Sequence, residues 1–97
     1  MKTYAILRRA AWGSADELAV AAELSAHVAE AMHDEVRWIR TYVIDEPRDQ
    51  LGAICIYEAT SPEAIREHAA AVGMPADEII AVTQTVVLHA DPTVARP

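Results

Sequence analysis

The sequence is poor in several residue types, and each shortage excludes a class of protein. A single cysteine excludes an intrachain disulfide framework. Eight Lys and Arg residues face 15 Asp and Glu residues, for a net charge of −7. Such an acidic chain is unsuited to nucleic acid or to an anionic membrane surface, since both carry negative charge. We therefore expect neither as a partner.

Long apolar runs are also missing. No segment approaches the roughly 18 apolar residues that a transmembrane helix needs. The start of the chain, MKTYAILRRAAWG, has too short an apolar segment, broken by two arginines, for a signal peptide. These features predict a cytoplasmic location.

What remains has the composition of a globular domain. The 97 residues are 53% hydrophobic and 24% charged, a balance typical of folded proteins rather than disordered ones. Alanine supplies much of the apolar fraction, and phenylalanine is absent. We expect a single domain over residues 1–88 and a flexible tail over residues 89–97, which contain two prolines and no periodicity.

Six segments have the residue pattern of regular elements. Alternation and β-branched residues favour strands, whereas apolar residues at helical spacing favour helices. A polar turn over residues 45–50 joins two of the strands into an antiparallel hairpin. The expected order is strand 2–8, helix 15–32, strand 36–44, strand 51–58, helix 62–72 and strand 78–88.

Both helices carry start signals in the sequence. Ser14 and Glu17 have the spacing of a capping box. Ser61 followed by Pro62 is typical of a helix start. Gly73 is expected to end the second helix, because glycine readily adopts the left-handed conformation that follows a helix.

The resulting order, β-α-β-β-α-β, predicts an α+β fold of the ferredoxin-like class. Right-handed crossovers then place both helices on one face of a four-stranded antiparallel sheet. In the third strand Cys55 and Tyr57 share one face, whereas Ile54 and Ile56 share the other. Both faces are substantially apolar, so we expect the open face to be covered by a second copy. The predicted assembly is a homodimer that packs sheet on sheet and encloses a small cavity.

Three segments resemble a known protein family. They are Cys-Ile-Tyr-Glu-Ala at 55–59, Arg-Glu-His-Ala at 66–69 and Gly-Met-Pro-Ala-Asp at 73–77, preceded by a strand with aromatic residues at Trp38 and Tyr42. The similarity runs from about residue 4 to 87. The chain resembles a set of small single-domain bacterial proteins of unknown function, some of which are described as nickel-binding proteins.

This resemblance implies a dimeric ferredoxin-like fold of the α+β barrel type, and a divalent metal ion such as nickel as a possible cofactor. The nickel-binding members have histidines near the end of the first strand. This chain has Arg8 and Arg9 at that place, which argues against the same nickel ligands here.

Four neighbouring residues form the candidate catalytic group: His68, Cys55, Glu58 and Tyr57. His68 is suited to act as a general base or metal ligand, and a Cys55 thiolate beside a cation would be a nucleophile. The structural alternatives are a buried apolar Cys55, an exposed His68 and a Glu58 carboxylate that pairs with Arg66.

A second group is the candidate ligand-binding set: Tyr42, Trp38, Arg8 and Trp12. Tyrosine hydroxyls that face a cavity would hold a ligand by hydrogen bonds. Arg8, with Arg9 and Trp12 beside it at the end of the first strand, would hold an anionic ligand at a cavity mouth. For Arg8, Arg9 and Trp12, the alternative is that they keep an edge strand soluble.

No metal motif such as HExxH or CxxC is present, and the metal-binding residues stay unknown. Weak acid–histidine combinations do occur; they are Glu23 with His27 and Glu30, His33 with Asp34 and Glu35, and His89 with Asp91.

Three hypotheses of function follow. The preferred one is a small dimeric ligand- or metal-binding protein of unassigned activity. The alternative is a cofactor-independent enzyme of the isomerase, cyclase or oxygenase type, with a cavity lined by Cys55, Tyr57, Glu58 and His68. The third is a ligand-binding or interaction module without chemistry.

Overall fold

The computed structural model describes residues 1–92, which form one four-stranded antiparallel sheet with two helices. The strands are β1 (Lys2–Trp12), β2 (Val36–Glu46), β3 (Gln50–Ala59) and β4 (Glu78–Ala81), and the helices are α1 (Ala15–Ala31) and α2 (Pro62–Val72). The strand order is β2-β3-β1-β4. The predicted α+β ferredoxin-like fold is confirmed.

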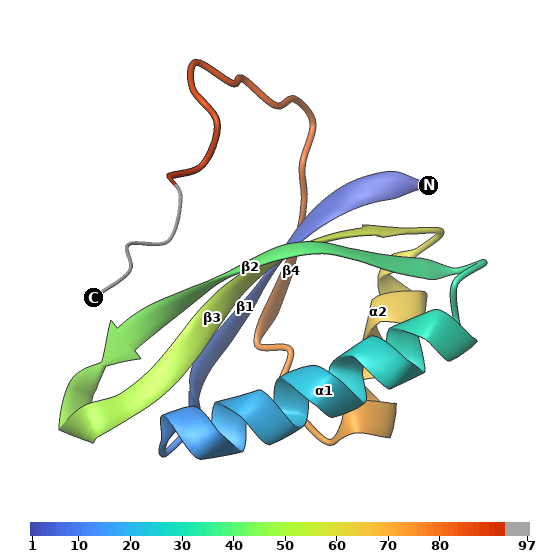
Figure 1. Ribbon diagram of the computed structural model, residues 1–97. Coiled ribbons are helices and arrows are strands. Elements are labelled where there is room, and N and C mark those ends of the chain that lie inside the picture. Colours follow the sequence, from blue (N-terminus) through green and yellow to red (C-terminus); the bar gives the residue numbers. More distant parts are fainter. Residues whose placement is uncertain (93–97) are drawn as a thin grey trace.

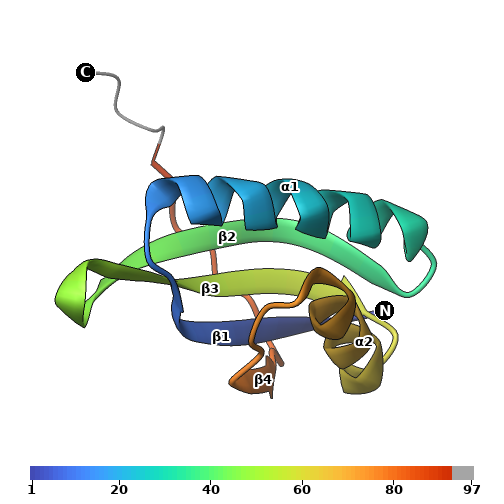
Figure 2. The same ribbon diagram turned by 90° about the horizontal axis from the view of Figure 1, so that it is seen from below.

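Both helices lie on the same face of the sheet, and the opposite face carries only the chain that follows β4 (Figure 1). Helix α1 contacts β2 and α2 and runs along β2 in the view from the helix side (Figure 2). The core lies between the helices and the sheet, where Ile6, Tyr57 and Ile65 are almost completely buried.

The helix ends follow the predicted signals. The side chain of Ser14 accepts a hydrogen bond from the backbone N–H of Glu17, and Ser61 does the same for Ala64. Gly73 closes α2 in the left-handed conformation, with φ of 80°. Helix α1 packs lightly, because only Ser25 and Ala29 are buried along its length. A lightly packed helix leaves space between itself and the sheet.

The first strand is longer than predicted and contains an irregularity. Arg8 pairs with Ala53 and Trp12 pairs with Leu51, so three residues of β1 stand opposite a single residue of β3. This β-bulge allows the chain to continue as a strand where the sequence predicted the end at Arg8. Bulges reorient the side chains that follow them.

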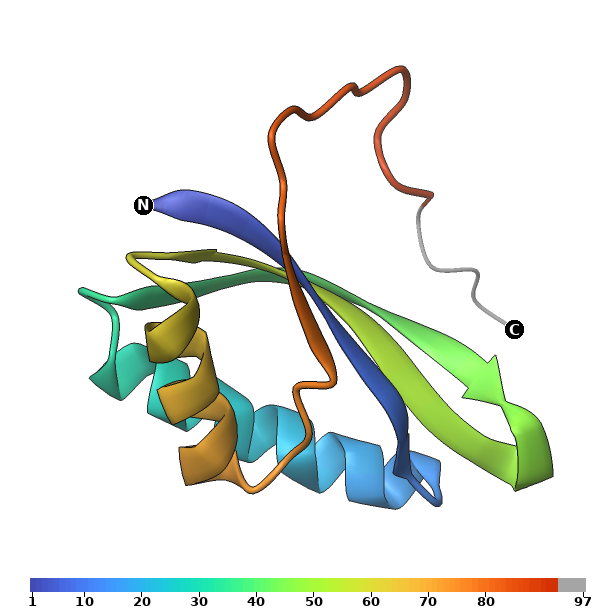
Figure 3. The same cartoon turned by 180° about the vertical axis from the view of Figure 1, so that it is seen from behind.

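The last strand is shorter than predicted. It ends at Ala81, whereas the sequence pattern predicted a strand as far as Leu88. The reason is the register: Ala81 pairs with Tyr4, and the Val82 N–H still donates to the Thr3 carbonyl at 2.9 Å. Beyond that point β1 has almost no backbone left to pair with. The following residues leave the sheet edge and rise over the open face (Figure 3).

The hairpin turn is also tighter than expected. Strand β2 extends to Glu46 and β3 begins at Gln50, so only residues 47–49 form the turn. The predicted tail over residues 89–97 lies partly outside the described residues. None of the helices in the described part of the chain is long and apolar enough to cross a membrane.

Candidate functional site

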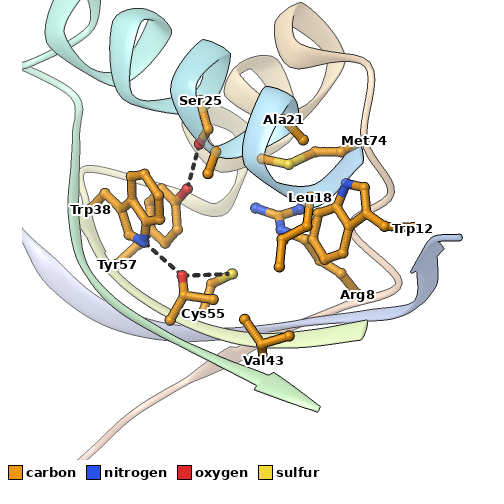
Figure 4. Close-up of a pocket in the computed structure, with 12 residues that line it drawn as sticks. Arg8, Trp12, Leu18, Ala21, Ser25, Trp38, Val43, Cys55, Tyr57 and Met74 are labelled. Atoms are coloured by element: carbon orange, nitrogen blue, oxygen red, sulfur yellow. Dashed lines mark hydrogen bonds between the residues drawn. The ribbon is translucent and has the colours of Figure 1, made fainter. Parts of the chain in front are cut away.

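A cavity of about 160 Å³ lies between α1 and the sheet. Its walls come from α1, from the helix-facing side of β1, β2 and β3, and from the loop after α2 (Figure 4). The lining residues are Arg8, Trp12, Leu18, Ala21, Ala22, Ser25, Trp38, Thr41, Val43, Cys55, Tyr57 and Met74.

Arg8 is the charged residue of this cavity and is completely buried. It lies in β1 on the same face as the core residues Tyr4 and Ile6, because side chains alternate along a strand. Its Nη1 donates a hydrogen bond to the Pro75 carbonyl oxygen. Its guanidinium carbon lies 6.0 Å from the centroid of the Tyr57 ring, within the range of a cation–π contact.

The other two guanidinium nitrogens of Arg8 have no hydrogen-bond partner. Nε and Nη2 are both buried and both unpaired within residues 1–92. No carboxylate of that part of the chain forms an ion pair with Arg8. A buried guanidinium stays charged, and a buried charge without a partner is costly. Arg8 therefore has an unmet requirement for an anionic or hydrogen-bond-accepting partner.

The β-bulge places Trp12 beside Arg8. The Glu46 side chain accepts hydrogen bonds from the Ala10 N–H at 2.7 Å and from the Arg9 guanidinium at 2.8 and 2.9 Å. These contacts hold the bulge closed and turn Arg9 away from the cavity. Trp12 then returns to the helix-facing side, where it is 8% exposed.

Tyr57 and His68 are linked through Ser25. The Ser25 hydroxyl lies 3.2 Å from the Tyr57 hydroxyl and 3.4 Å from His68 Nε2. His68 Nε2 also donates to the Ser25 carbonyl at 3.0 Å. A carbonyl only accepts, so the ring carries its proton on Nε2 and Nδ1 is a bare acceptor. Nδ1 is buried without a partner among the residues that the structure describes.

Burial keeps both rings in their neutral forms. It lowers the pKa of His68, an effect that the hydrogen bond to the Ser25 carbonyl opposes. Burial also raises the pKa of Tyr57, although the bond from Ser25 and the charge of Arg8 act in the other direction. Both shifts favour the uncharged form of the ring.

A second hydrogen-bonded chain forms the wall nearest β2. The Trp38 indole N–H donates to the Thr41 hydroxyl at 2.7 Å, and this hydroxyl donates to the Cys55 sulfur at 3.3 Å. The Trp38 ring stacks on Tyr57 with 6.3 Å between centroids. Cys55 is buried and free, as expected for a small apolar side chain.

The structure separates the predicted catalytic group. Cys55 and Tyr57 line the cavity. His68 lies behind Tyr57, edge-on to its ring at 5.4 Å between centroids, and is fully buried rather than exposed. Glu58 lies on the open face and pairs with Arg37 at 3.2 Å instead of Arg66. The expectation that all four line one cavity is wrong, because Glu58 follows Tyr57 directly and must point to the opposite face.

The predicted ligand-binding set divides in the same way. Arg8, Trp12 and Trp38 meet in the cavity (Figure 4). Tyr42 does not: it lies on the open face, where its hydroxyl donates to Asp91 at 2.8 Å.

The polar or flexible cavity residues Ser25, Thr41 and Met74 are among those not identified from the sequence. Ser25 had a readable signal, since a serine within the apolar stripe of a helix requires a hydrogen-bond partner. Thr41 had none, because a second irregularity in β2 between Trp38 and Arg40 decides which face it takes. Met74 reaches the cavity through the loop after α2, which only the tertiary structure defines.

The cavity does not suit a nickel ion. Among the described residues, its lining includes two sulfur side chains, Cys55 and Met74, and no histidine or carboxylate. The fixed charge of Arg8 would repel a divalent cation inside an apolar site. No group of three histidine, cysteine or acidic residues gathers elsewhere in residues 1–92. The acid–histidine combinations seen in the sequence therefore do not assemble into a metal site in the described chain.

The chain is similar to known proteins in both sequence and fold. Residues 4–82 match the model of a family described as nickel responsive protein SCO4226-like. The crystal structure of SCO4226 from Streptomyces coelicolor A3(2) has the same fold, with a TM-score of 0.68 and 22% sequence identity. The similarity covers 87% of this chain and 99% of that one. No curated protein matches the chain.

Proposed function

The chain belongs to the SCO4226-like family of nickel responsive proteins, and from this premise we propose that it is a small homodimeric ligand-binding protein. The ligand site is the cavity between α1 and the sheet. One observation carries the proposal: Arg8 is buried in the cavity wall with two guanidinium nitrogens unpaired in the described chain. Folded proteins rarely leave such groups without a partner, and a bound ligand would supply one.

An organic ligand suits this site better than a metal ion does. The reachable walls consist largely of aromatic and aliphatic groups, including Trp12, Trp38 and Leu18. Apolar cavities with a few polar groups are typical of small-molecule sites. Any nickel that the protein binds therefore belongs outside this cavity.

Binding is also better supported than catalysis. Burial favours the neutral form of the two ionisable rings, because it raises the pKa of Tyr57 and lowers the pKa of His68, which lies behind Tyr57. A general acid–base catalyst works best with a pKa near the working pH. The catalytic roles of Cys55, Tyr57, Glu58 and His68 remain hypotheses.

The dimer is supported by the open face of the sheet. Large apolar side chains on this face and on the segment after β4 are exposed; they include Ile39, Tyr42, Ile80, Val86 and Val87. Exposed apolar surface of this extent marks an interaction site. A second copy, which presents the same apolar surface, is the partner that a two-fold interface requires.

A binding experiment with a cavity-filling variant tests the ligand site. Small apolar probes of benzene size are titrated into the protein, and the fluorescence of Trp12 and Trp38 reports their binding. Ala22→Leu fills the cavity and is expected to abolish the response, whereas Ala19→Leu makes the same change on the exposed side of α1 and is expected to leave it intact. Saturating nickel is expected to leave probe affinity unchanged.

The proposal fails if folded wild-type protein binds no probe. It also fails if the Ala22→Leu variant binds as well as the wild type does.

A further inference from the structure

The two unpaired nitrogens of Arg8 lie on one edge of the guanidinium group. Nε and Nη2 present parallel N–H bonds along this edge, while Nη1 is already bound to the Pro75 carbonyl. We propose that the ligand is a compact aromatic monocarboxylate of benzoate size, whose two oxygens accept from these two nitrogens. This inference rests on the proposed function and names the chemical class of the ligand.

The geometry of the free edge favours a carboxylate. Two parallel N–H bonds match the two coplanar oxygens of a carboxylate and form a bidentate pair. The Pro75 contact fixes the guanidinium plane from its other end, so the fork is already oriented before the ligand arrives. Figure 4 shows the guanidinium pointing toward the space enclosed by Tyr57, Ser25 and Leu18.

The charge of the cavity favours a monoanion. Among residues 1–92, Arg8 is the only charged residue in the lining. One negative charge neutralises it, whereas a dianion such as a phosphate monoester would leave an uncompensated charge among apolar walls. The same argument excludes a cationic ligand.

The volume and the walls define the body of the ligand. A dry engineered cavity of about 150 Å³ binds benzene, and this cavity measures about 160 Å³. Trp12, Trp38 and Tyr57 provide aromatic surface around it, and aromatic surfaces pack well against a flat ring. A single six-membered ring with one carboxylate therefore fits this space.

The ligand requires a small rearrangement to reach Arg8. Both unpaired nitrogens are shielded from solvent, so a wall side chain must turn aside. Met74 is suited to this, because it is unbranched and half-buried and follows the left-handed Gly73 at the end of α2.

The experiment compares benzoate with benzamide, a neutral molecule of the same shape, by isothermal titration calorimetry. Wild-type protein is expected to bind benzoate about tenfold or more tightly than benzamide, since hydrogen bonds to charged groups are stronger than neutral ones. Arg8→Met is expected to lose this preference. Arg8→Lys is expected to retain only part of it, because lysine keeps the charge without the fork. Arg66→Met, an exposed control on α2, is expected to behave as wild type.

Each outcome decides one proposal. Equal affinity for benzoate and benzamide overturns the carboxylate inference and leaves the cavity as a ligand site. If the folded wild type binds neither benzoate nor benzamide nor any other benzene-sized probe, both the carboxylate inference and the proposed ligand site are overturned. The wild-type comparison needs no variant, so it remains decisive if Arg8→Met does not fold.

Discussion

Arg8 retains its positive charge in the protein interior because a guanidinium group is not deprotonated in proteins. Its burial follows from strand alternation, which places it two residues after Ile6 on the helix-facing side. The cost of burying this charge is offset in part by the Tyr57 ring and the Pro75 carbonyl. Nε and Nη2 of Arg8 still lack a hydrogen-bond partner in the described chain, and both proposals rest on this feature.

His68 has a different role at the residue scale. It is buried in α2, and its Nε2–H bond to the Ser25 carbonyl joins α2 to α1. The cavity meets Ser25 and Tyr57 but not the His68 ring. We therefore regard His68 as a group that holds the two helices together in its neutral form.

The first prediction concerns pH. Burial lowers the pKa of His68 below its ordinary value of 6.5, so the unfolded chain takes up the proton more readily than the folded one. The stabilising contribution is complete above about pH 6.5 and is lost as the pH falls toward the folded pKa. The free energy of unfolding, measured by denaturant titration between pH 7 and about pH 5, is expected to fall more steeply for the wild type than for His68→Leu. Identical pH slopes for the two proteins would contradict this assignment.

At the scale of elements, the β-bulge in β1 organises the cavity. It separates Arg8 from Trp12 by three residues that stand opposite Gly52, and it leaves Ala10 with a φ of 46°. The Glu46 carboxylate accepts hydrogen bonds from the Arg9 guanidinium and the Ala10 backbone N–H, and these bonds lower the pKa of Glu46. After the bulge Trp12 lies on the same helix-facing side of β1 as Arg8.

The second prediction tests the backbone opposite this bulge. A Cβ atom at position 52 would lie 2.7 Å from the Arg8 carbonyl oxygen and 2.8 Å from Glu46 Oε2. Gly52→Ala is therefore expected to destabilise the fold by about 1–3 kcal/mol, as overpacking does, and to weaken ligand binding by shifting Arg8. Thermal unfolding and probe titration measure both effects.

Gly13→Ala is the matched control for Gly52→Ala. Its Cβ would meet only the flexible Glu17 side chain, at 3.2 Å, so a smaller loss of stability is expected. Equal losses of stability for the two variants would show that the close approach at Gly52 does not add to the destabilisation.

At the scale of the whole molecule, the open face of the sheet remains to be covered. The segment after β4 crosses this face without pairing as a strand, and Asp91 binds Arg40 and Tyr42 there. Val86 and Val87 in this segment remain largely exposed, at 73% and 70%. A chain of this size gains stability by burying such surface in a dimer.

The third prediction tests that assembly. Ile39→Glu places a charge on the open face of β2 and is expected to convert the dimer into a monomer, because the charge would be buried without a partner. Sedimentation equilibrium measures the mass of each variant. Val20→Glu, at an exposed position on α1, is the control and is expected to remain dimeric. A monomeric wild type would refute the dimer.

Much of the candidate site was predictable from the sequence, and the errors have physical causes. Arg8, Trp12, Trp38, Cys55 and Tyr57 were identified and do meet in the cavity. Glu58 and Tyr42 were wrongly grouped with them, because they lie on the opposite face of the sheet. For Glu58 the alternation of β3 already indicated this result, and proximity in sequence was the misleading signal.

The sequence alone determined the elements, their order and therefore the ferredoxin-like fold. Its capping serines, its Gly73 and its alternating strands act over a few residues, and local sterics and hydrogen bonding are enough to specify them. The tertiary structure alone decided which groups share a cavity. That outcome depends on the β-bulge after Arg8, on the register of β4 against β1, and on the loop that brings Pro75 to the guanidinium. Each of these joins residues far apart in the chain, so packing decides them where local preference does not.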